Sequence, residues 1–206
     1  MIKILNFAAV FMALSLGAAN AADVVPESTY SWTGFYSGIH VEYTSVDGNY
    51  FADTVGDFDI GAEGVKFGTL GGYNYQSGNL VFGLESDSGF GSIKDSNAVI
   101  ESYKIGLEGT ARSRMGFAFN RVLPFVTAGV ALAEAKSTDQ GVGADSQYHL
   151  GLVLGGGLEF AATDHIRLRG EYLFESFGKE TYNIGIFNDT AKWDQHVARA
   201  AVIWAW

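Results

Sequence analysis

HVARAAVIWAW, residues 196–206, is the stretch of sequence that decides the fold. Every second residue counted back from Trp206 is apolar down to Ala198, and the interleaved set contains Arg199. A period of two is typical of a β-strand, because successive side chains point to opposite faces. One face of this strand suits lipid and the other can hold a charge, so the stretch predicts a membrane-spanning strand.

The beginning of the chain indicates export. Lys3 precedes a short apolar run, and Ala19-Asn20-Ala21 supplies the small residues that a signal peptidase requires. We therefore predict a signal peptide over residues 1–21 and a short periplasmic leader over residues 22–31. The remaining residues, 32–206, have the length of one domain.

Composition narrows the class of protein further. The chain is 48% hydrophobic and 14% aromatic, yet no stretch after the signal is apolar for the eighteen or so residues that a membrane helix needs. It has 27 glycines, 2 prolines and no cysteine, which favours β structure and excludes a disulfide scaffold. A net charge of −10 without a basic stripe disfavours binding to nucleic acid.

Six further stretches alternate in the same way as the last one, and a seventh, 125–134, consists of small and apolar residues, so that its facing is not fixed. The predicted strands are 32–43, 65–76, 80–90, 105–119, 125–134, 147–162, 166–177 and 196–206. Between these strands, long connecting segments and short ones follow each other alternately along the chain. The long ones are 44–63, 91–104, 135–146 and 178–194, and the short ones are 77–78, 120–124 and 163–165. Long exposed loops on one rim and short periplasmic turns on the other are typical of outer-membrane barrels. The predicted fold class is all-β, an eight-stranded antiparallel up-and-down transmembrane β-barrel.

The two faces of the strands also predict pairing and orientation. A turn at 77–78 would pair Tyr75 with Leu80, and the short turn after the sixth strand would set Glu159 opposite Arg169. A soluble eight-stranded barrel would put its apolar face inside. In this chain Arg and Glu share a face with most glycines, so the apolar faces are predicted to point outward, towards lipid.

Four pieces of the chain resemble a known family. They are WTGFYSG (32–38), GGYNYQSGNLVFGLESD (71–87), ARSRMGFAFNRVLPFVTAGVA (111–131) and GLEFAATDHIRLRGEYLF (157–174). Together they are similar to the alphaproteobacterial small outer-membrane β-barrel proteins, the porin-like and opacity-type surface proteins. The resemblance implies the Gram-negative outer membrane as location, and lipid, lipopolysaccharide and the barrel assembly machinery as partners. That machinery reads the C-terminal strand, where the family usually has phenylalanine and this chain has Trp206.

The inward faces carry six basic and seven acidic residues, close to charge balance. An eight-stranded barrel is just wide enough for side chains to fill it, so we expect these charges to pair across the lumen. The predicted ion-pair network is Glu42, Lys66, Glu85, Glu108, Arg112, Arg114, Glu159, Arg167, Arg169, Glu171 and Arg199, with Asp87 and Glu175 on the same face. Arg199 should reach Glu171 and Glu42. The alternative interpretation is a charged selectivity filter in a narrow passive pore.

Aromatic residues near strand ends are expected at the two membrane interfaces. These are Trp32, Tyr43, Tyr75, Tyr148, Trp204 and Trp206.

The histidines have no spacing typical of a metal site, and no metal or cofactor is expected. His40 and His149 point inward by parity and are predicted to be structural. Because some members of the similar family bind haem at the surface, a haem site at these two residues is the alternative. Ser176 and His196 face outward on adjacent strands, but a hydrolase also needs an orienting acid, and none is expected on that face, so no catalytic residue is predicted.

The predicted function is that of a non-enzymatic outer-membrane surface protein, with a lumen largely plugged by ion pairs, that supports envelope integrity and surface contacts. A haem-binding surface receptor and a narrow passive porin are the alternatives. Any host or haem ligand would bind at the long loops.

Overall fold

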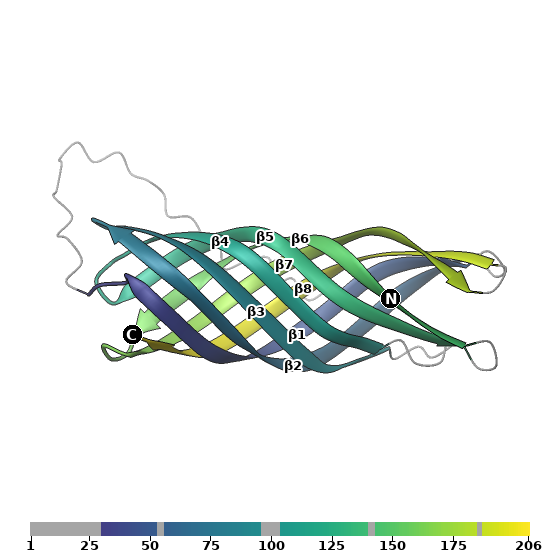
Figure 1. The fold of residues 1–206 in the computed structure, drawn as a ribbon, viewed down its shortest axis with the longest axis horizontal. Coiled ribbons are helices and arrows are strands. Elements are labelled where there is room, and N and C mark those ends of the chain that lie inside the picture. Colours follow the sequence, from purple (N-terminus) through teal and green to yellow (C-terminus); the bar gives the residue numbers. More distant parts are fainter. Residues whose placement is uncertain (1–29, 53–55, 96–103, 140–142, 185–186) are drawn as a thin grey trace, which may run out of the picture.

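The computed structural model describes residues 30–52, 56–95, 104–139, 143–184 and 187–206. These residues form eight antiparallel strands that pair in sequence order, and the last strand pairs with the first to close a barrel (Figure 1). The strands are β1 (Gly34–Ala52), β2 (Gly56–Ser77), β3 (Leu80–Asp95), β4 (Lys104–Phe117), β5 (Val122–Asp139), β6 (Gly143–Ala161), β7 (Ile166–Ile184) and β8 (Phe187–Ala205). The predicted fold class is confirmed. The described residues include no helix that is long and apolar enough to cross a membrane.

The loop prediction was wrong for three of the four long segments, which are strand over most of their length, and for both ends of the fourth, 91–104. The ladder of β1 and β2 continues through polar pairs such as Asp47 opposite Gly61, almost to the middle of the predicted loop 44–63. Strands likewise extend into 91–104, 135–146 and 178–194. Alternation of apolar and polar residues requires one face to meet lipid, whereas backbone pairing does not, so the strands outlast their sequence signal. The middle parts of these segments, including 96–103, lie outside the described residues.

The outward face of the barrel forms the lipid band, as predicted. Phe35, Leu84 and Tyr148 are 67%, 68% and 71% exposed although the residues beside them in sequence face the lumen. On β2 the outward apolar band runs over residues 65–75, which matches the roughly 9–11 residues that a membrane strand needs. Above this band, outward positions such as Asp47 and Glu63 are polar and exposed. The strands therefore extend beyond the hydrocarbon layer at the end opposite the short turns.

One predicted register was wrong and another was confirmed. In the β2–β3 hairpin Ser77 pairs with Leu80 and Tyr75 with Phe82, two residues away from the predicted pairing. The turn is Gly78-Asn79, where Gly78 adopts a φ of 59° that a residue without a side chain tolerates best. A shift of two leaves every side chain on its predicted face. Glu159 pairs with Arg169 as predicted.

The register also fixes the tilt of the strands. The row of paired residues that begins at Ser37 on β1 passes through Ala111 on β4 and returns to β1 at Asp47, ten residues further along the strand. Strands in such staggered barrels tilt by roughly 35–45° from the barrel axis. Each row of neighbouring side chains therefore rises from the end of the barrel with the short turns (the short-turn end) towards the opposite end, where the strands extend beyond the lipid band (the long-strand end).

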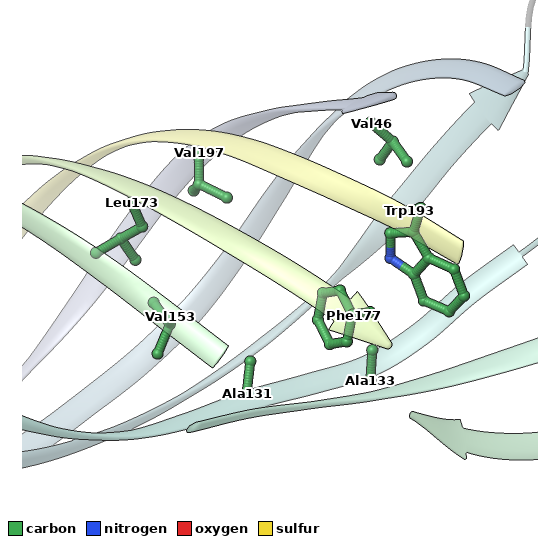
Figure 2. Close-up of a cluster of buried hydrophobic side chains, with 8 residues drawn as sticks. All are labelled: Val46, Ala131, Ala133, Val153, Leu173, Phe177, Trp193 and Val197. Carbon is green, nitrogen blue, oxygen red and sulfur yellow. The ribbon is translucent and has the colours of Figure 1, made fainter. Parts of the chain in front are cut away.

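Of the three buried apolar clusters, two lie on either side of the charged middle of the barrel. The short-turn cluster consists of Tyr30, Trp32, Val81, Ala118, Leu123 and Ala161. The long-strand cluster consists of Val46, Ala131, Ala133, Val153, Leu173, Phe177, Trp193 and Val197, and Figure 2 shows these side chains gathered in the interior. The charged residues of β1–β4 and β6–β8 occupy the layer between them.

Candidate functional site: the charged lumen

The charged residues on the inward faces meet in one layer of the lumen. Every second residue of each strand faces inward, and on seven of the eight strands charged residues occupy these inward positions at a similar height in the barrel. β5 instead contributes small inward residues at that height, such as Thr127 and Ala131. The charged side chains are nearly inaccessible to solvent: Glu159 is 0% exposed, and Glu171 and Arg199 are 6% exposed.

Glu159 is the carboxylate nearest the short turns, and three guanidinium groups surround it. One of its oxygens lies 2.9 Å from Arg114 and 2.8 Å from Arg169, and the other lies 3.5 Å from Arg167. Arg114 also lies over the ring of Phe125, with its guanidinium carbon 4.2 Å from the ring centre. Burying one carboxylate among three cations leaves positive charge that must be compensated by other carboxylates.

Glu85 supplies part of that compensation from the opposite wall. Its oxygens lie 2.7 Å from Arg169 and 2.6 Å from Arg112, and the Tyr36 hydroxyl donates a hydrogen bond to it at 2.8 Å. Arg169 is on β7 and Glu85 is on β3, so the pair crosses the lumen instead of running along the wall. Such cross-lumen bonds occupy the space through which a solute would have to pass.

Arg199 on β8 links the last strand to three others. It lies 2.7 Å from Glu42 on β1, 3.2 Å from Glu171 on β7 and 3.2 Å from Asp87 on β3. Glu42 in turn lies 3.0 Å from the ammonium group of Lys66. The structure thus brings Arg199 to both carboxylates that the sequence pattern places beside it.

The far edge of the charged layer is less well paired. Lys66 lies 2.5 Å from Glu108, but Glu175 has no ion pair within the described part of the chain. Glu175 is 1% exposed, and its Oε2 atom has no hydrogen-bond partner among the described residues. Gln195 is its neighbour across the β7–β8 ladder, and the side-chain amide nitrogen and oxygen of Gln195 also have no hydrogen-bond partner among the described residues. Glu175 is the acidic residue by which the carboxylates outnumber the cations.

The short-turn end contains a plug that the sequence analysis missed. Trp32 was predicted at the membrane interface, which is wrong: it is 0% exposed and its indole nitrogen donates to the carbonyl of Asn120 at 3.0 Å. The Arg167 guanidinium lies 4.7 Å from the Trp32 ring centre and donates to the Tyr30 hydroxyl at 2.9 Å. Parity could have revealed this, because even-numbered residues of the first strand face inward.

The other five predicted interface aromatics point outward. Tyr43, Tyr75, Tyr148, Trp204 and Trp206 are 47%, 58%, 71%, 47% and 67% exposed. Tyr75 and Trp204 lie close to the short turns, while Tyr43 and Tyr148 lie towards the opposite edge of the lipid band. These positions suit rings that anchor a strand at the two edges of a membrane.

The two inward histidines lie within the wall and not at a surface. His40 is 4% exposed with its Nδ1 atom 3.5 Å from Glu42, and a side chain at Gly68 would collide with its ring. His149 is fully buried, and its ring centre lies 4.3 Å from that of Trp193. A surface haem needs an accessible imidazole nitrogen, so this burial argues against the alternative of a surface haem site at these residues.

The outward Ser176 and His196 do have an acid beside them, contrary to the sequence analysis. Asp194 faces the same side as His196 and pairs with Ser176 across the β7–β8 ladder. The Nδ1 atom of His196 instead shares a hydrogen bond of 2.5 Å with the Tyr172 hydroxyl. No side-chain hydrogen bond among the described residues connects His196 to Ser176 or Asp194.

The fold and its lumen define a barrel of the outer-membrane type: it is closed, its outer face is apolar and its interior is charged. The sequence matches the outer membrane protein beta-barrel domain family over residues 8–202. The chain belongs to this family, and its location is the outer membrane.

Relatives and solved structures agree with this assignment. The chain is 35% identical to the 25 kDa outer-membrane immunogenic protein of Brucella abortus, over 79% of this chain and 72% of that one. It is 30% identical to the 22 kDa outer membrane protein of Rhizobium leguminosarum, over 89% and 82%. The crystal structure of the outer membrane protein OprG from Pseudomonas aeruginosa shares the fold with a TM-score of 0.61 at 12% identity, covering 87% of this chain and 99% of that one.

Proposed function

We propose that this protein is a non-enzymatic structural barrel of the outer membrane, with a lumen closed by ion pairs, that supports envelope integrity and surface contacts. The observation that carries the proposal is the charged layer. Its guanidinium and carboxylate groups cross the lumen from wall to wall, as in the 2.7 Å contact of Arg169 with Glu85. The plug at Trp32 and the long-strand cluster at Trp193 lie on either side of that layer.

The same charged layer argues against the alternative function, a narrow passive pore. A solute would have to separate pairs that are bonded within an interior no wider than its side chains. Loss of one partner from a buried pair leaves an uncompensated charge, which costs about 3–5 kcal/mol. Separating a pair leaves two such charges. Several pairs would have to open together, because Arg199 alone contacts Glu42, Glu171 and Asp87.

Surface contacts would be made by the part of the barrel above the lipid band. There the outward residues are polar and exposed, as at Asp47, Glu63 and Lys192. The Brucella relatives are named immunogenic, which supports a corresponding exposed face in this chain. We expect lipopolysaccharide to surround this end, the assembly machinery to read β8, and any host ligand to bind at the connections at this end of the strands.

Export would precede assembly. On this proposal residues 1–21 are removed as a signal peptide and the mature chain begins at Ala22. Tyr30, at the end of the proposed leader, is already part of the plug. N-terminal sequencing of protein from outer-membrane fractions tests the cleavage site; a mature chain that begins before residue 19 or after Tyr30 would contradict it.

A deletion strain separates the structural role from the pore. Loss of a structural barrel should increase sensitivity to detergent and to large antibiotics, and the wild-type gene should restore resistance. Loss of a pore should instead slow the uptake of small hydrophilic solutes and leave detergent resistance unchanged. The second pattern, or no change in either measurement, would contradict the proposal.

A further inference from the structure

The lipid-facing wall of the barrel is uneven. On β6 it presents Leu150, Leu152, Leu154 and Leu158, which are 59–68% exposed. On β1 to β4 it presents a row of small residues that pair directly with one another across the strands: Ser37, Gly71, Ser86 and Ala111. Between the large outward side chains of β1 to β4, such as Ile39, Phe67 and Leu84, this row therefore leaves a strip of wall that carries little more than backbone.

This bare row is the floor of a groove of about 930 Å³ that reaches from β1 to β5. Phe35, Tyr73 and Leu84 form its side towards the short turns, Trp206 borders it beside β1, and Val130 borders it on β5. The outward-facing residues of the groove include no charged side chain. Phe35 and Tyr73 pack edge to face, with ring centres 4.8 Å apart, which makes that side of the groove firm.

The groove has the dimensions of one lipid chain in one leaflet. Its floor crosses five strands spaced by about 4.8 Å, which gives a length of about 19 Å. Because strands tilt by roughly 35–45°, the row climbs about 13 Å along the barrel axis. One leaflet of the hydrocarbon core is about 15 Å deep. The low end of the groove is beside Trp206 and the short turns, on the periplasmic side.

We infer that this groove seats one acyl chain of a phospholipid from the periplasmic leaflet. The groove is continuous with the lipid-facing wall of a protein that resides in the outer membrane, so hydrocarbon is the medium in contact with it. A chain lying along the floor contacts backbone and both sides of the groove, whereas an empty groove would lose those dispersion contacts. The ordered chain then covers the row of small residues.

A second copy of the barrel fits this groove poorly. Most homodimers form by two-fold symmetry, so the same patch of each copy would meet itself. Groove would then face groove, and both hollows would stay unfilled. An acyl chain needs no matching ridge, because it adapts its own conformation to the floor.

Two outward alanines provide a matched pair of variants. Ala111 lies in the floor of the groove, whereas Ala200 on β8 lies outside it and is likewise exposed. Replacing each with leucine adds the same side chain to the lipid-facing wall. Ala111→Leu should fill the groove and Ala200→Leu should not. Ser86→Leu is a second filling variant, for use if Ala111→Leu does not fold.

The test is native mass spectrometry of full-length mature protein, reconstituted in palmitoyl-oleoyl phosphatidylethanolamine vesicles and extracted in mild detergent. Wild type and Ala200→Leu should retain one phospholipid per barrel. Ala111→Leu and Ser86→Leu should retain it about tenfold less, the affinity equivalent of roughly two methylene contacts. Heat-modifiable migration on a detergent gel verifies that each variant is folded.

Three results would overturn the inference. The first is equal retention of phospholipid by all variants. The second, from a parallel reconstitution with purified lipopolysaccharide, is retention of lipopolysaccharide in preference to phospholipid. The third is a dimer of the wild type that Ala111→Leu dissociates, which would assign the groove to a second copy.

Discussion

The two edges of the charged layer differ in how their carboxylates are compensated. Glu159, nearer the short turns, has three guanidinium groups within 3.5 Å. Glu175, at the far edge, has no ion pair among the described residues and an oxygen without a hydrogen-bond partner. Outside Glu159 the wall carries Leu158 and Phe160, whereas outside Glu175 it passes from Phe174 to Ser176. Compensation is therefore complete around Glu159 and incomplete around Glu175, where the outward face of β7 becomes polar.

The largest effect is expected at the well-paired edge. Glu159→Ala leaves three buried guanidinium groups sharing fewer carboxylates, and the free energy of unfolding should fall by about 3–5 kcal/mol. Urea unfolding of the protein in phospholipid vesicles, followed by tryptophan fluorescence, measures this change. A decrease below about 1 kcal/mol would show that the guanidinium groups are compensated by water and not by Glu159.

A slightly smaller effect is expected at the plug below that edge. Trp32→Ala removes a fully buried ring that contacts the Arg167 guanidinium, and the loss should be about 3 kcal/mol. The same unfolding measurement applies, read by circular dichroism because a tryptophan is lost. If Trp32 faced the membrane interface instead, replacement by Phe would restore full stability; inside the lumen, Phe cannot make the hydrogen bond to Asn120 and should remain destabilised.

Residue patterns predict the wall and the lumen of this barrel well, for a physical reason. Lipid outside and charge inside impose strict alternation, so Arg199 and Glu171 could be placed together from parity and the order of the strands. The polar extensions of the strands were missed because outward residues above the lipid band, such as Asp47, face water, so that no apolar outward face marks these stretches as strands. The plug was missed because Trp32 stands at the start of the first predicted strand, where an aromatic residue is typical of a membrane interface, and this position was given more weight than its inward parity.

Two matched Glu→Gln variants test how well the carboxyl groups are compensated towards the far edge of the charged layer. Glu171→Gln weakens charged hydrogen bonds to Arg112 and Arg199, and should cost about 2 kcal/mol. Glu175→Gln, on the same strand and the same face, replaces a carboxyl group that has no ion pair among the described residues, and should change stability by less than about 1 kcal/mol. Equal losses in the two variants would mean that Glu175 is as well compensated as Glu171.

The smallest effect is expected outside the lumen altogether. Asp164 forms a 2.6 Å ion pair with Arg121 at the short turns, but its side chain is 75% exposed. Exposed pairs contribute about 0–1 kcal/mol, so Asp164→Ala should be close to neutral and serves as the control for Glu159→Ala. A loss as large as that of Glu159→Ala would contradict the assignment of Glu159 to the interior.

Single-channel recording in planar lipid bilayers tests the closed lumen most directly. Purified wild-type protein, verified as folded by its heat-modifiable migration, should give no conductance steps above the bilayer baseline at moderate salt and voltage. Steady open-channel steps from the wild type would contradict the account, because ions would then pass a layer in which Arg169, Glu85 and Arg112 are bonded across the lumen.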